Sequence, residues 1–246
     1  MIVRLILAAL AAGLIAGLAM TPAQYVKVVP LILQAESYET ADSGGHHHGP
    51  ADTAALSRAE GTGAHAHAHD DEGAAPGLGR FGNTVLANLV AGGGFALMLA
   101  AAALLAGIEF PKGREALGRG LALGAAGWFA VQLAPGWGLP PELPGFPHID
   151  LQARQLWWVA TATLSAGGLY LVALRHEIAL KIAGLALIVA PHLYGAPRPT
   201  DIASNVPAFL ASEYAAAALA TTLFFWLVLG AALGYFLSRA APAEPI

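Results

Sequence analysis

The hydrophobic residues gather in six long runs, which cover residues 2–21, 81–106, 116–133, 156–174, 178–193 and 214–237. The hydrocarbon core of a bilayer is about 30 Å thick, and a helix crosses it with about 20 residues. Backbone groups in lipid must be paired internally, and continuous apolar runs favour helices over the alternating strands of a barrel. The pattern therefore predicts an all-α protein, a polytopic transmembrane helix bundle of about six spans, with residues 1–246 forming a single membrane domain.

Small residues mark the faces on which these helices are expected to pack. In the first run they recur every four residues, at Ala9, Gly13, Gly17 and Thr21. Such spacing lets two helix backbones approach closely in a membrane. Comparable stripes lie at Gly92, Ala96 and Ala100, at Gly120 and Gly124, and at Gly230 and Gly234. Pro22 is expected to close the first span, and a cleaved signal peptide is the alternative reading of that run, because Arg4 precedes its apolar core.

Composition and charge support a membrane protein and exclude several classes. Charged residues make up only 11% of the chain, whereas soluble domains have about a quarter. A net charge of −4 without a basic patch gives no surface for nucleic acid. The absence of cysteine excludes disulfides and thiolate metal sites. With an even number of spans, basic residues close to the span ends favour both termini in the cytoplasm.

A long polar connection, residues 36–79, follows the first span and is too poor in apolar residues to bury a core, so we expect it to be disordered. It contains two histidine clusters, His46, His47 and His48, and then His65, His67 and His69, which acidic residues follow. Neutral imidazole is the commonest protein ligand for divalent transition metals. This loop, predicted on the outer face, is interpreted as a flexible metal scavenger; a solvated linker and a pH-sensing tract are the alternatives.

Further candidate ligands lie near the predicted span ends. Glu36 follows the first span, where Met20 and Gln24 share a helix face if the helix continues past Pro22. His148 and Asp150 are two residues apart in a proline-rich outer connection, where a structural hydrogen bond is the alternative role. His192 follows Pro191, which frees carbonyl groups at a helix end, a setting in which transporters bind cations. A capping role for His192 is the alternative.

The order of several short segments resembles one family. These are Thr21-Pro22-Ala23-Gln24, Gln34-Ala35-Glu36, Pro140-Pro141-Glu142-Leu143-Pro144-Gly145, Ala153-Arg154-Gln155-Leu156-Trp157-Trp158 and Pro191-His192-Leu193-Tyr194-Gly195-Ala196-Pro197. Nearly the whole chain is similar to the CbtA family, described as probable cobalt transporter subunits. The resemblance implies a bacterial inner-membrane protein linked to cobalamin synthesis, and a small single-span, histidine-containing CbtB-like companion. It supplies no established binding residues.

These observations together predict a membrane subunit that takes up a divalent transition metal. Cobalt is the leading ion, although the order of metal affinities allows nickel or zinc. A metal-capture module that passes ions to a separate permease is the alternative. The sequence has no glycine-rich phosphate loop and no His-Glu-x-x-His motif, so we expect neither ATP coupling nor an enzyme. No cofactor is expected apart from the transported or bound metal.

Overall fold

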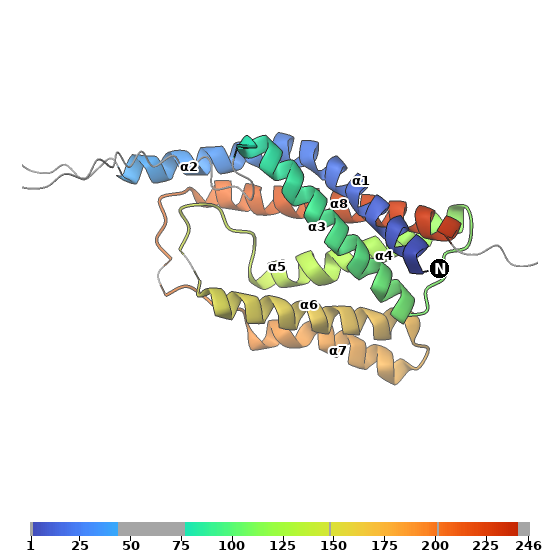
Figure 1. Ribbon diagram of the computed structural model, residues 1–246. Helices are drawn as coiled ribbons and strands as arrows, with labels where there is room; N and C mark the ends of the chain where they lie inside the picture. Colours follow the sequence, from blue (N-terminus) through green and yellow to red (C-terminus); the bar gives the residue numbers. More distant parts are fainter. Residues whose placement is uncertain (1, 44–76, 148, 201, 241–246) are drawn as a thin grey trace, which may run out of the picture.

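The computed structural model describes residues 2–43, 77–147, 149–200 and 202–240, with only the backbone of residues 39–43. These parts are helical and contain no strand, which confirms the all-α prediction for the described residues (Figure 1). The helices are α1 (Ile2–Lys27), α2 (Val29–Ser43), α3 (Gly79–Leu105), α4 (Arg114–Trp128), the π-helix η1 (Phe129–Leu133), α5 (Ala134–Gly138), α6 (Leu151–Leu174), α7 (Ile178–Tyr194) and α8 (Ala208–Ala240).

Four of these helices, α1, α3, α6 and α8, are long and apolar enough to cross a membrane. The fifth predicted span corresponds to α7, which is apolar but has only 17 residues. The third corresponds to the uninterrupted helical run of α4, η1 and α5, in which the 15-residue α4 changes to π-helix at Phe129. Six spans therefore remain a prediction.

The prediction that Pro22 closes the first helix is wrong. Pro22 lies inside α1, which continues to Lys27, and the chain resumes as α2 at Val29. The ring of Pro22 points away from the packed face, because Pro22 is exposed whereas the two preceding residues, Met20 and Thr21, are buried. A proline whose ring meets no neighbouring helix costs a hydrogen bond without forcing the helices apart.

The predicted boundary of the first polar connection is also corrected. The helix α2 extends to Ser43, so residues 36–43 are helical rather than part of a loop. On the other side, α3 begins at Gly79, as expected to within two residues. The histidine clusters lie in residues 44–76, outside the described residues.

Glycine contacts join the helices in pairs, as the small-residue stripes predicted. A Cβ atom added to Gly13 would collide with the backbone of Gly92, and one added to Gly17 would collide with that of Asn88. The pair α4 and α8 meets in the same way, with Gly120 against Gly230 and Gly124 against the carbonyl of Trp226. Close backbone approach of this kind gives membrane helices their packing energy.

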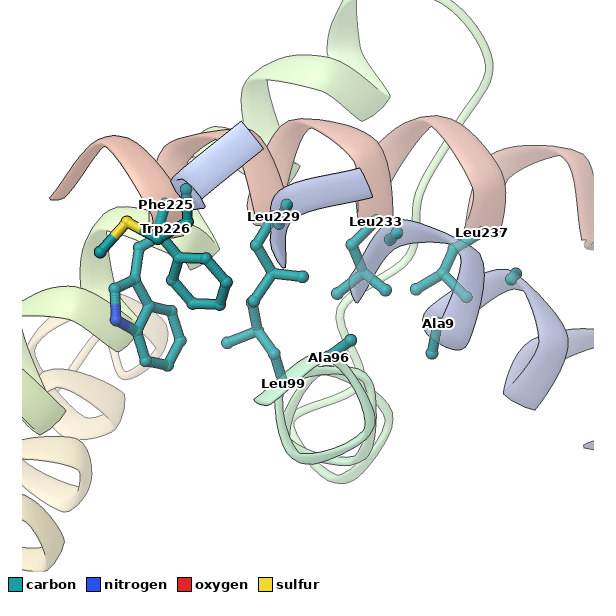
Figure 2. Close-up of a cluster of buried hydrophobic side chains, with 12 residues drawn as sticks. Ala9, Ala96, Leu99, Phe225, Trp226, Leu229, Leu233 and Leu237 are labelled. Carbon is teal, nitrogen blue, oxygen red and sulfur yellow. The ribbon is translucent and has the colours of Figure 1, made fainter. Parts of the chain in front are cut away.

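The main core lies where α1, α3 and α8 meet. Figure 2 shows Leu229, Leu233 and Leu237 in a row along α8, facing Ala9 of α1 and Ala96 and Leu99 of α3. At one end of this row, Phe225 and Trp226 contact Phe95, with ring centroids 6.1 and 5.1 Å apart. Small residues on α1 face large residues on α8, and together they fill the core.

The hairpin of α6 and α7 forms a second unit beside this core (Figure 1). The two helices contact each other at Gly168 and Gly184. Near the start of α6 the hairpin packs against η1 and α5. The remaining length of α6 makes few contacts with the α1–α3–α8 core.

The two ends of the bundle differ in character. At the basic end lie the start of α1, the turns α3–α4 and α6–α7, and the end of α8 (Figure 1). These segments carry the basic residues Arg4, Lys112, Arg114, Arg119, Arg175, Lys181 and Arg239. At the opposite end, called here the loop end, α2 packs on α8 and two connections through a small core of Leu31, Ala35, Leu143, Val206 and Leu210. The charge distribution required for the predicted orientation is thus present in the fold.

Candidate functional site

A polar cluster lies where α1 and α3 contact each other. Both helices are apolar enough to span a membrane. The amide nitrogen of Asn88 donates hydrogen bonds to Thr21 Oγ1 at 3.1 Å and to Gln24 Oε1 at 2.7 Å. Thr21 in turn donates to the carbonyl oxygen of Gly17 at 3.3 Å. Polar groups at membrane depth are costly and are functional candidates for that reason.

Sequence reasoning singled out Gln24 but assigned no role to Asn88. The missing information was which face of α3 meets α1. Gly17 packs on the backbone of Asn88, and Gly13 on that of Gly92, so the small-residue stripes of both helices fix Asn88 against Gln24. The stripes signal the packing faces, but the sequence does not say that the stripe of α1 meets that of α3, so this pair could not be found without the structure.

The contact surface between α1 and α3, called here the α1–α3 seam, is polar at the loop end and tightly packed toward the basic end. At the loop end, Arg80 Nη2 pairs with Glu36 Oε1 at 3.3 Å, which ties α2 to the first turn of α3. Next, Tyr25 and Phe81 meet edge to face with centroids 5.2 Å apart, and the Asn88 cluster follows. Beyond it, Met20 is buried and the backbones of Gly13 and Gly92 touch. The structure is therefore closed toward the basic end along this seam.

Seven of the eight predicted histidine ligands lie outside the described residues, namely His46, His47, His48, His65, His67, His69 and His148. Both helices that flank residues 44–76 belong to the α1–α3 seam, because α2 continues α1 and α3 follows. The described chain stops at Ser43, seven residues after Glu36, and resumes at Gly77, three residues before Arg80.

The other predicted ligands have structural partners. Asp150 caps α6: its Oδ2 accepts a hydrogen bond from the amide of Ala153 at 2.8 Å. His192 is half-buried near the end of α7, where its ring contacts Trp157 edge to face at 5.9 Å. Glu36 pairs with Arg80. Within the ranges that the structure describes, no three His, Asp or Glu side chains come together to hold a metal ion.

A second polar spot lies in the α6–α7 hairpin. Thr161 and Ser165 are completely buried one turn apart on α6, and no described group accepts or donates a hydrogen bond to either hydroxyl. They continue the buried face of Trp157, whose ring touches His192. Unpaired hydroxyls in an apolar interior cost free energy. Their spacing of four residues matches an ordinary packing stripe, so the sequence gives no sign that they are unpaired.

An all-helical fold with four spanning-length apolar helices and polar groups buried between them defines the class of helical membrane proteins. The family model of CbtA, described as a probable cobalt transporter subunit, matches residues 2–238. The chain therefore belongs to the CbtA family, which confirms the resemblance inferred from its short motifs. No match to the chain was found among the curated proteins or among the solved structures compared.

Proposed function

We propose that the protein carries a divalent transition metal, with cobalt as the leading ion, from the outer face of a bacterial inner membrane toward the cytoplasm. Membership of the CbtA family is the observation that carries this proposal. In it, the histidine clusters His46–His48 and His65–His69 capture the ion outside, and both termini lie inside. Imidazole nitrogen suits cobalt, nickel and zinc alike, so the ion is chosen by geometry and supply rather than by affinity alone.

The seam between α1 and α3 is the favoured entrance for the captured ion. The capture segment is anchored on both sides of this seam, by α2 and α3, and the Gln24–Asn88 cluster lies next along it. Glu36 supplies a carboxylate, and the carboxamide oxygens of Gln24 and Asn88 supply neutral oxygen ligands. Met20, one turn further along α1, offers a thioether sulfur at the closed part of the seam.

Entry at Glu36 requires competition with Arg80. The two side chains are each little more than one-third exposed, so the pair is weakened by solvent and easily exchanged. A divalent cation with partial ligation by imidazole can displace one guanidinium from a carboxylate at modest cost. Arg80 then acts as a gate that repels ions lacking such ligands.

The His148–Asp150 pair and His192 form a second set of ligands in the proposal, at the α6–α7 hairpin. Asp150 Oδ2 already caps α6, and its other carboxylate oxygen is available to an ion. Movement of the hairpin relative to the core would be required to bring this set to the α1–α3 seam, since α7 packs mainly against α6.

The test is accumulation of cobalt, nickel and zinc in cells expressing the wild type and matched variants. Deletion of residues 45–72, which removes all six clustered histidines, and the substitution Asn88→Leu are both expected to lower uptake. For Asn88→Leu the expected loss is about tenfold, the equivalent of about one strong polar contact. Asn83→Leu makes the same chemical change on the same helix and is the control for Asn88→Leu. His192→Ala should also lower uptake, and its control is His176→Ala, at the basic end. Unchanged uptake of all three ions in the deletion and in Asn88→Leu would refute the route.

The second candidate function is metal capture followed by delivery to a separate permease. The description of the family as a subunit favours it, and a CbtB-like single-span protein is the proposed companion. Membrane vesicles containing this chain alone distinguish the two. Binding without flux, followed by flux once a partner is added, supports delivery, whereas flux with the chain alone supports transport.

A further inference from the structure

A cavity of about 710 Å³ lies between η1, α5 and the first turns of α6, at the loop end of the bundle. Its polar lining includes Gln132, Arg154 and Gln155, and its apolar lining includes Leu139, Leu151 and Val159. None of the metal ligands proposed above lines it. Two of its apolar lining residues, Leu151 and Val159, are 67% and 54% exposed on the surface of the bundle.

Two tryptophans fix the walls of this cavity. Pro135 has no N–H for the carbonyl oxygen of Val131 four residues earlier, and Trp158 Nε1 donates to that oxygen at 3.0 Å. On the other side, Trp157 Nε1 donates to the carbonyl oxygen of Pro135 at 3.3 Å. The start of α6 is thus tied to the π-helical turn, and the cavity is formed before any ligand enters.

The polar side chains that line the cavity are Arg154, which is ion-paired with the neighbouring Glu142, and two amides. Arg154 Nη1 lies 2.9 Å from Glu142 Oε2, and the two side chains are 37% and 22% exposed. The carboxamides of Gln132 and Gln155 form no hydrogen bond with any described residue. Arg154 and two neutral amides thus line the cavity, and the carboxylate of Glu142 adjoins it through its ion pair with Arg154, so the whole group has a net charge of zero.

The level of the cavity in the membrane follows from its aromatic residues. Trp158, which lines the cavity, is 43% exposed, and Trp137, next to the lining residue Gly136, is 81% exposed. Tryptophan exposed on membrane helices concentrates where hydrocarbon meets the headgroups. The cavity thus lies where a lipid can place its headgroup on the polar residues and its chains along α6.

We propose that this cavity binds a zwitterionic aminophospholipid, of the phosphatidylethanolamine type, from the leaflet at the loop end. The phosphodiester accepts hydrogen bonds from Arg154 and a glutamine amide. The ammonium group donates to Glu142 and to an amide oxygen. An anionic headgroup satisfies Arg154 but meets Glu142 uncompensated, and a choline headgroup has no N–H to donate. The acyl chains lie along Leu151 and Val159.

Native mass spectrometry of the full chain, released from detergent micelles with added lipid, measures this preference. We expect phosphatidylethanolamine to bind about tenfold more tightly than phosphatidylglycerol or phosphatidylcholine, the equivalent of one charge-assisted hydrogen bond. Arg154→Gln and Gln155→Leu should remove most of the preference. Gln152→Leu is the matched control, because Gln152 is exposed one turn earlier on α6 and does not line the cavity.

A charge-switch variant keeps the proposal testable if a loss-of-binding variant folds poorly. Glu142→Gln leaves Arg154 unpaired and should reverse the preference in favour of phosphatidylglycerol, a gain that misfolding cannot produce. Equal binding of all three lipids by the wild type, or an unchanged preference in Glu142→Gln, would overturn the proposal. Displacement of the lipid by millimolar phosphoethanolamine without chains would overturn the assignment to a lipid, whereas failure to displace it supports that assignment.

Discussion

Two glycines on α3 provide a sharp test of how the bundle is held together. Gly92 and Gly94 are two residues apart on one helix but face different surroundings. A Cβ atom on Gly92 would collide with the carbonyl oxygen of Gly13, and would lie 3.1 Å from the carbonyl carbon of Gly13 and 3.3 Å from the amide nitrogen of Gly17. A Cβ atom on Gly94 would meet no atom within 4 Å.

The magnitude of the Gly92→Ala effect follows from this geometry. The obstacle is rigid backbone of α1, so α1 and α3 must separate by about an ångström, which removes a quarter to a half of the dispersion energy of each contact affected. Inserting a methyl group into a packed interior typically costs about 1–3 kcal/mol. Gly94→Ala gains helix propensity of up to about 1 kcal/mol and loses no contact.

Thermal unfolding in detergent, followed by fluorescence-detected size exclusion, compares the two variants directly. We expect Gly92→Ala to unfold several degrees below the wild type, whereas Gly94→Ala should unfold at the same temperature or slightly above it. Equal shifts for the two variants, or a larger loss for Gly94→Ala, would contradict the register in which α1 packs on α3.

Three further predictions concern individual side chains. Asn88→Leu removes two hydrogen bonds to α1 and should destabilise the protein by about 1 kcal/mol, since such bonds average about 0.6 kcal/mol each in membranes. Adding Gln24→Leu to this variant should cost less than Gln24→Leu costs in the wild type, as a double-mutant cycle of unfolding would measure. Asp150→Ala should cost about 1 kcal/mol through loss of the α6 cap, whereas Asp150→Asn should keep the unfolding temperature and lower metal binding measured by titration, if Asp150 also binds the ion. Trp158→Phe leaves the carbonyl of Val131 without its indole donor and should destabilise the protein by about 1–3 kcal/mol in the same unfolding assay, while Trp137→Phe, at an exposed position, should be close to neutral.

The apolar runs predicted the class of fold because their length is a direct consequence of membrane thickness. The helix partners were partly readable too, since the small-residue stripes at Gly13 and Gly92, and at Gly120 and Gly230, are the contacts that the structure contains. Which stripe meets which was not readable, because a stripe records the size of side chains and not the identity of the helix across from it.

Helix ends were predicted less well because they depend on surroundings. Pro22 was expected to stop α1, but its ring faces away from the neighbouring helices and the helix continues to Lys27. The helix α2 extends into a stretch that looked too polar to fold. It is stabilised by burial of Leu31 and Ala35 against α8 and the connections at the loop end, a tertiary contact that local composition does not contain.

The residues of the candidate site were likewise only partly predictable from the sequence. Gln24 was recognisable as a polar residue close to the end of a span. The role of Asn88 follows only from the structure, in which its amide nitrogen donates a hydrogen bond to Gln24 Oε1. The lipid cavity was not predicted at all, since it arises from a π-helical turn and two indole hydrogen bonds between segments that are more than twenty residues apart.

The central claim is that this chain moves a divalent metal into the cell. Uptake by proteoliposomes tests that claim most directly. The purified protein is reconstituted, a potential of 100 mV, negative inside, is imposed, and internal cobalt is measured with time. A potential of that size stabilises a divalent cation inside by about 4.6 kcal/mol, so accumulation on the order of a thousandfold is permitted without another energy source. We predict accumulation that disappears when the potential is collapsed and falls in Asn88→Leu. Cobalt levels equal to those of protein-free vesicles, with or without the potential, would contradict the claim.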